Sequence, residues 1–227
     1  MRPPLEFLFP PEAGAELIYS FVIVVCSLMI YFATKEMYEL SSYKGIKYFR
    51  ISFLFFAIAY FFRYSIKYLL ILFNIKDIIE ISPAYFGGIS LFIFLYSSSM
   101  AIFYLLYSVM WKKWNHSKVK IFLFNMAAIL IALIGIIFRG FETDLILNVI
   151  LLFFILFVLY VAYKDSNKKQ KGKSLFIIYL LLFVFWVLNV LDVLMPRFLE
   201  LYRLAIYVVS ILLFMIILYK VLKKTGN

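Results

Sequence analysis

Seven long apolar stretches constrain this chain more than any other feature of its sequence. A helix needs about 20 apolar residues to cross a hydrocarbon core of roughly 30 Å. The stretches lack the alternation of transmembrane β-strands, and helices satisfy their own backbone groups in lipid. We therefore predict an all-α bundle of seven transmembrane helices, forming one integral membrane domain over residues 1–227. The predicted spans are Ala15–Thr34, Tyr48–Phe73, Tyr85–Met110, Ile121–Phe138, Leu145–Tyr163, Ser174–Met195 and Leu204–Leu222.

The composition supports a membrane protein and excludes several other classes. Hydrophobic residues make up 66% of the chain, against roughly 45–50% in soluble domains. A soluble globule would have to expose much of that apolar surface to water. A cytosolic enzyme is therefore excluded, and one cysteine excludes a secreted disulfide scaffold. We expect a multi-pass protein of the cell membrane, with the lipid bilayer as its first partner.

The positions of Lys and Arg predict the orientation of the chain. Cytoplasmic loops retain basic residues, whereas acidic residues contribute little to topology. The loops after the first, third and fifth spans, together with the C-terminus, hold most of the 23 basic residues. This predicts an N-terminus outside and a C-terminus inside the cell. The same asymmetry explains the net charge of +11, so no nucleic-acid partner is needed. The basic inner residues are Lys35, Lys44, Lys47, Arg50, Lys112, Lys113, Lys118, Lys120, Lys164, Lys168, Lys169, Lys171, Lys173, Lys220, Lys223 and Lys224.

Residue types that catalysis or cofactor binding would need are scarce. His116 is the one histidine and Cys26 the one cysteine, so His-based zinc sites and CxxC pairs are excluded within the membrane. The last span has no lysine before Lys220, which excludes a mid-helix retinal Schiff base. No glycine-rich phosphate loop or serine-nucleophile motif is present. We expect no enzymatic activity, no metal and no cofactor.

One group of polar residues inside the predicted spans stands out as a candidate site. Ionisable groups in hydrocarbon are costly and usually turn towards the bundle interior. Arg63 and Lys67 share a predicted face with Tyr60 and Tyr64, at i, i+3, i+4 and i+7. Trp186, Asn189 and Asp192 form a stripe on the sixth span, at a depth that overlaps that of Lys67. Asp192 is a candidate counter-ion for Arg63 or Lys67, and Glu16 of the first span is its competitor. The candidate ligand-binding residues are Tyr60, Arg63, Tyr64, Lys67, Trp186, Asn189 and Asp192.

Two interpretations of this group stay open at the level of sequence. It can be a structural salt bridge with polar packing around it, since buried ion pairs often serve specificity rather than stability. It can also line an outward-facing, water-accessible cavity, whose positive charge would attract a small anionic or carboxylated ligand. For Trp186, packing in the core is the alternative to lining that cavity.

The short basic first inner loop leads into an aromatic-rich second helix, YKGIKYFRISFLFFAIAYFFRY. With seven spans and an outside N-terminus, this arrangement resembles the seven-helix sensory modules at the N-termini of some prokaryotic histidine kinases. The resemblance implies a membrane sensor or receptor-like module. We expect no kinase, cyclase or receiver domain after Asn227. We expect a separate cytoplasmic or membrane signalling partner to contact the basic loops. A small-solute transporter or permease, or a structural subunit of a membrane complex, are the alternatives.

Overall fold

The computed structural model of the chain describes residues 11–65, 83–114, 118–138, 140–166, 173–195 and 200–225. Within these ranges the chain is helical and contains no strand. Seven helices are long and apolar enough to cross a membrane, which confirms the all-α, seven-span prediction. They are α2 (Pro11–Ser41), α3 (Lys44–Tyr60) with its π-helical continuation η1 (Phe61–Ser65), α6 (Pro83–Met110), α7 (Lys118–Ile137), α8 (Phe141–Ser166), α9 (Lys173–Leu194) and α10 (Glu200–Thr225).

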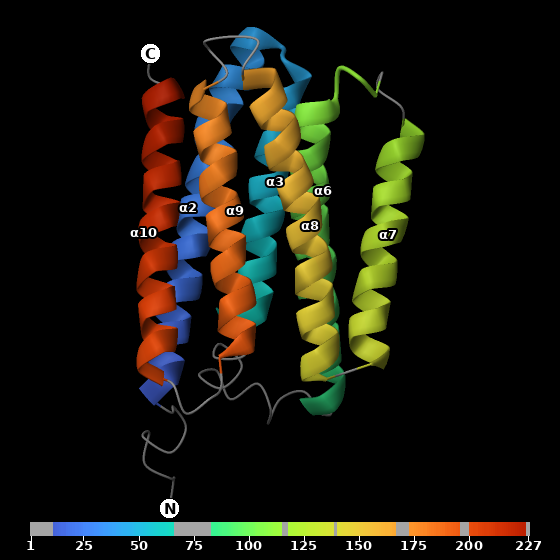
Figure 1. Cartoon of the computed structure of the whole chain (residues 1–227), viewed down its shortest axis with the longest axis vertical. Helices are drawn as coiled ribbons and strands as arrows, with labels where there is room; N and C mark the ends of the chain where they lie inside the picture. Colours follow the sequence, from blue (N-terminus) through green and yellow to red (C-terminus); the bar gives the residue numbers. More distant parts are fainter. Residues whose placement is uncertain are drawn as a thin grey trace, which may run out of the picture.

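The helices pack side by side with their axes nearly aligned (Figure 1). Helix α3 lies between α2 and α6, and α10 lies between α2 and α9. Helix α8 contacts α9 and α6, while α7 packs mainly on α6 at the edge of the bundle. Helix α2 begins at the end of the bundle opposite to the end at which α10 finishes (Figure 1). Which end faces the cytoplasm stays a prediction from the charges.

Several helices continue beyond the predicted apolar spans. Helix α2 runs past Thr34 to Ser41, and α10 begins at Glu200 rather than at Leu204. The extra turn of α2 carries Lys35 and Glu39, whose Nζ and Oε1 atoms lie 3.9 Å apart. Charged residues end an apolar run, but at i and i+4 they support a helix. Apolar length therefore predicts where lipid ends, and the helices project further into the interfaces.

The second predicted span differs from the structure in its helical geometry. A uniform helix over Tyr48–Phe73 was expected, whereas α3 begins at Lys44 and its regular α-helical part ends at Tyr60. The chain then widens into the π-helical turn η1. Residues 66–73 of that span lie outside the described residues.

The buried face of α3 is aromatic and faces α9 and α10. Phe49, Phe53, Phe56 and Tyr60 recur at alternating steps of four and three residues, and all are buried. Because these rings fill the centre of the bundle, they fix the rotation of α3 about its axis. The same face continues past Tyr60, so the residues that follow lie towards α9. The rings that they contact are Tyr179, Phe185 and Trp186 on α9 and Phe214 on α10.

Candidate functional site

The π-helical turn η1 presents backbone carbonyls to the neighbouring helices. Ser20 of α2 donates from Oγ to the Tyr60 carbonyl at 2.7 Å. Ser90 of α6 donates to the Phe62 carbonyl at 2.6 Å. Hydroxyls inserted at the backbone ladder of a helix can change its pitch, and π turns are frequent at functional sites. The turn is therefore held from both sides, and it carries Arg63.

Arg63 is the central cation of the site. Its Nη2 donates to Asp192 Oδ2 at 3.3 Å, and its Nη1 donates to Asn189 Oδ1 at 3.1 Å. The guanidinium carbon also lies 5.1 Å from the centroid of the Phe94 ring on α6. The predicted pairing of Arg63 with Asp192 is thus present in the structure.

A second arginine, Arg203 of α10, contacts the same carboxylate. Its Nε lies 3.4 Å from Asp192 Oδ1, and its Nη2 donates to the Met195 carbonyl at 3.4 Å. The candidate residues predicted from the sequence do not include Arg203. A signal was available, because Asp192 and Arg203 flank the short connection at Pro196. Two antiparallel helices joined there must bring these two residues close together.

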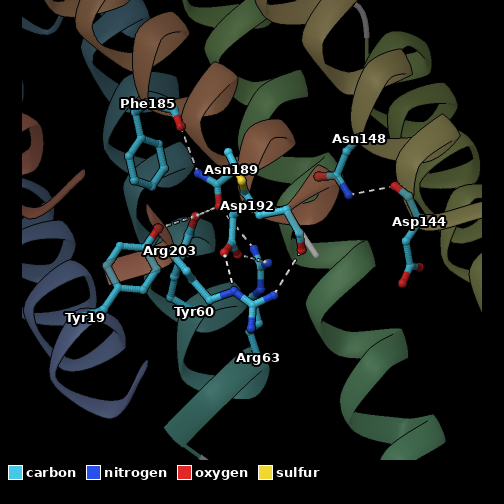
Figure 2. Close-up of polar contacts among 10 residues, drawn as sticks. Tyr19, Tyr60, Arg63, Asp144, Asn148, Phe185, Asn189, Asp192 and Arg203 are labelled. Atoms are coloured by element: carbon cyan, nitrogen blue, oxygen red, sulfur yellow. Dashed lines mark hydrogen bonds and ion pairs between the residues drawn. The ribbon is translucent and has the colours of Figure 1, made fainter. Parts of the chain in front are cut away.

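Asp192 therefore bridges two arginines from different helices, and Figure 2 shows the three side chains meeting at one point. We refer to Arg63, Asp192 and Arg203 as the arginine bridge. The two arginine side chains are each 18% exposed, and that of Asp192 is 9% exposed. The bridge ties together the ends of α3, α9 and α10.

A line of hydrogen bonds extends from the arginine bridge to α2. Tyr60 Oη donates to Asn189 Oδ1 at 2.6 Å, and Tyr19 Oη donates to Tyr60 Oη at 3.4 Å. Asn189 Nδ2 donates to the Phe185 carbonyl at 2.9 Å, which holds its amide with the oxygen towards Tyr60 and Arg63. Tyr19 in turn stacks on Tyr207 of α10, with ring centroids 4.7 Å apart. Tyr60 and Asn189 of the predicted set are thus brought together with Arg63.

Trp186 lies in the core of the bundle, where its indole binds a helix backbone. It is 3% exposed, and its Nε1 donates to the Asn148 carbonyl of α8 at 3.2 Å. Asn148 also donates to the Asp144 carbonyl on α8, apart from the arginine bridge (Figure 2). This arrangement matches the packing alternative for Trp186. Of the other predicted residues, Lys67 lies outside the described residues, as does the side chain of Tyr64.

The site combines two guanidinium groups with one carboxylate. The guanidinium groups of Arg63 and Arg203 each contact the carboxylate of Asp192. Guanidinium donors match the geometry of carboxylates. The hydroxyl, amide and aromatic groups that surround them in the described part of the chain carry no charge at neutral pH. These groups can bind and orient an anion, and they offer no nucleophile paired with a base.

Comparison with known proteins yields one relative over the full length of the chain. No protein-family model matches the chain, and no solved structure matches it. A protein of Archaeoglobus fulgidus, described as an uncharacterized protein, is 36% identical over 228 residues, covering 98% of this chain and 95% of the relative. The aligned region therefore includes all seven helices. The chain belongs to the same family as this archaeal protein.

Proposed function

We propose that the protein is a membrane sensor that binds a small anionic or carboxylated ligand at the arginine bridge. The observation that carries the proposal is the contact of Arg63 and Arg203 with a single carboxylate, at 3.3 and 3.4 Å. Ionisable groups inside a membrane are costly, and they usually mark a functional site. Two arginines from different helices exceed what one structural ion pair needs.

The position of the site suits a sensor. The arginines come from α3 and α10, and the carboxylate comes from α9. A ligand that binds one arrangement of these helices better than another shifts the equilibrium between arrangements. The helices run the length of the bundle to its basic end. We propose that this end faces the cytoplasm of the cell and that a signalling partner contacts it there.

The test is ligand-induced thermal stabilisation of the purified protein in lipid nanodiscs. Acetate, propionate, benzoate, succinate, phosphate and sulfate are added at constant ionic strength. We expect at least one of them to raise the unfolding temperature, because a ligand that binds only the folded state stabilises it. Arg63→Ala should abolish this rise.

Arg50→Ala is the matched control, because Arg50 is another arginine of α3 that lies far from the site. Its Nε donates to the Tyr31 carbonyl at 3.1 Å, near the opposite end of the helix. The control should keep the ligand-induced rise even if its basal stability falls. No rise with any anion, or the same rise in the Arg63→Ala variant, would refute the proposal.

A second candidate function, a small-solute transporter, is favoured by the π-helical turn at Phe61–Ser65. Transporters commonly place their substrate sites where a transmembrane helix is interrupted. Proteoliposomes loaded with buffer and exposed to a radiolabelled form of the stabilising anion distinguish the two functions. Uptake above that of the Arg63→Ala variant supports transport. Binding without uptake supports the sensor.

A further inference from the structure

We propose that Asp192 acts as an internal ligand of Arg63 and Arg203. A small monocarboxylate must displace the Asp192 carboxylate to bind these two arginines. This inference rests on the proposed function, and it specifies both the class of ligand and the way in which binding is sensed. The carboxylate of Asp192 stands where the carboxylate of the incoming ligand binds.

The carboxylate of Asp192 accepts one hydrogen bond from Arg63 and lies within ion-pair distance of Arg203 Nε. Asp192 Oδ2 faces Arg63 and Oδ1 faces Arg203, at 3.3 and 3.4 Å. Charge-assisted hydrogen bonds are usually about 2.7–2.9 Å long, and strong arginine pairs are often bidentate. Asp192 forms neither a short bond nor a bidentate pair. Its contacts are therefore those of a ligand that a better-placed carboxylate can replace.

The surroundings of Arg63 narrow the class of ligand. The Phe94 ring lies 5.1 Å from the guanidinium carbon. Tyr60 and Phe185 form a further aromatic contact next to Asn189, with ring centroids 5.8 Å apart. Tyr60 and Phe185 are buried in the core, so the partly exposed Phe94 ring is the one that offers apolar surface to the part of the ligand that follows its carboxylate. A short aliphatic or aromatic monocarboxylate fits this combination better than an inorganic anion or a dicarboxylate.

Displacement of Asp192 links ligand binding to the positions of the helices. Asp192 is on α9, whereas its two partners are on α3 and α10. A carboxylate that takes over both arginines removes the contacts of Asp192 with these helices, whereas Asn189 and the Met195 carbonyl still accept from Arg63 and Arg203. The side chain of Asn189, one turn deeper on α9, still accepts from Tyr60. We therefore expect the end of α9 to move about the Asn189 contact, while the core around Trp186 stays packed.

An internal competitor lowers the apparent affinity of the ligand. The apparent dissociation constant equals the intrinsic constant divided by the fraction of molecules in which the site is open. Asp192→Asn removes the competing charge and keeps nearly the same shape. The variant should therefore bind monocarboxylates more tightly than the wild type, by roughly tenfold if about one molecule in ten is open. A residue that only supports the fold would not give a gain in affinity.

The experiment is calorimetric titration of the full-length protein in nanodiscs with propionate and benzoate, with propionamide and benzamide as neutral analogues. Asp192→Asn is compared with the wild type and with Glu142→Gln. Glu142 is an exposed acid in the first turn of α8. Its variant removes the same charge at the same end of the bundle, so it controls for a general electrostatic gain.

We expect tighter carboxylate binding by Asp192→Asn, no comparable gain by Glu142→Gln, and no binding of the amides. If the wild type binds a carboxylate and Asp192→Asn binds it with equal or lower affinity, Asp192 is not an internal ligand. The proposed function is unaffected by that result. Absence of carboxylate binding in both proteins also overturns this inference, and the proposed function fails with it if none of the six anions raises the unfolding temperature. If Asp192→Asn does not fold, Asp192→Glu keeps the charge and should bind no more tightly than the wild type. A tenfold gain in Asp192→Glu would then contradict the inference.

Discussion

Gly45 sits where α3 and α6 approach most closely at the basic end of the bundle, so Gly45→Ala tests that contact. A Cβ added at Gly45 would lie 2.5 Å from Tyr43 Cε1, 2.9 Å from Trp111 Nε1 and 3.0 Å from the Ser108 carbonyl oxygen. The Tyr43 ring and the Trp111 side chain can shift, but the Ser108 carbonyl belongs to the backbone of α6 and can give way only if the helices separate. Overpacking of this kind costs about 1–3 kcal/mol.

The higher helix propensity of alanine offsets part of this overpacking cost. Alanine is favoured over glycine by about 1 kcal/mol in a helix interior, and by less in the first turn, where Gly45 lies. We therefore expect Gly45→Ala to lower the free energy of unfolding by about 1–2 kcal/mol. Gly87→Ala is the matched control, because a Cβ at Gly87 of α6 meets nothing within 4 Å. It should be neutral or should stabilise the protein by up to about 1 kcal/mol.

The assay is reversible unfolding in mixed micelles with increasing dodecyl sulfate, followed by far-UV circular dichroism. The two glycine variants should shift the midpoint in opposite directions. Equal shifts, or a Gly45→Ala variant as stable as the wild type, would refute the close packing of α3 on α6. Adding Tyr43→Ala should relieve only part of the loss. Complete relief would show that the Tyr43 ring, rather than α6, resists the methyl group.

Three further predictions follow from other contacts. Asn189→Leu keeps the approximate shape of the side chain but leaves Tyr60 Oη and Arg63 Nη1 without their acceptor, so the same assay should show a loss of about 1–3 kcal/mol. Trp186→Phe removes one hydrogen bond in the core, so it should cost about 1 kcal/mol and leave carboxylate binding unchanged. In a Cys26→Ala background, a membrane-impermeant maleimide added to intact cells should label Glu142→Cys and should not label Lys113→Cys.

Each of these predictions has a control or a refuting outcome. Asn125→Leu removes an acceptor used by Tyr96 alone, so a loss as large as that of Asn189→Leu would argue against a special role for the charged donor. Loss of carboxylate binding in the Trp186→Phe variant would indicate that Trp186 contributes to the ligand site. The reverse labelling pattern would invert the predicted topology.

The number of helices could be predicted because it depends on a local property of the sequence. Each span needs a run of apolar residues as long as the hydrocarbon is thick, and seven helices in the described part of the chain meet this condition. The ends of the helices were less predictable, since charged residues such as Lys35 and Glu39 continue a helix outside the apolar run. Orientation was inferred from a second property, the distribution of Lys and Arg, which the fold itself does not test.

The candidate site could be predicted in part. Asp192 was a candidate counter-ion for Arg63 or Lys67 because a charge in hydrocarbon needs a partner, and the structure pairs it with Arg63. Arg203 was missed because it lies at the edge of an apolar span, where a basic residue requires no explanation. The π-helical turn could not be predicted from the residues 61–65 themselves. It is held by Ser20 and Ser90, which belong to helices far away in the sequence.

The parallel contact of α2 with α10 limits how copies of this chain can be joined. The two helices are neighbours and run in the same direction, so α2 starts at one end of the bundle and α10 ends at the other (Figure 1). A flexible linker from the end of one copy would have to begin the next copy from the wrong surface. A tandem fusion with both copies upright therefore needs an added membrane-crossing helix between them. The same constraint means that a circular permutant cannot be closed with a soluble loop.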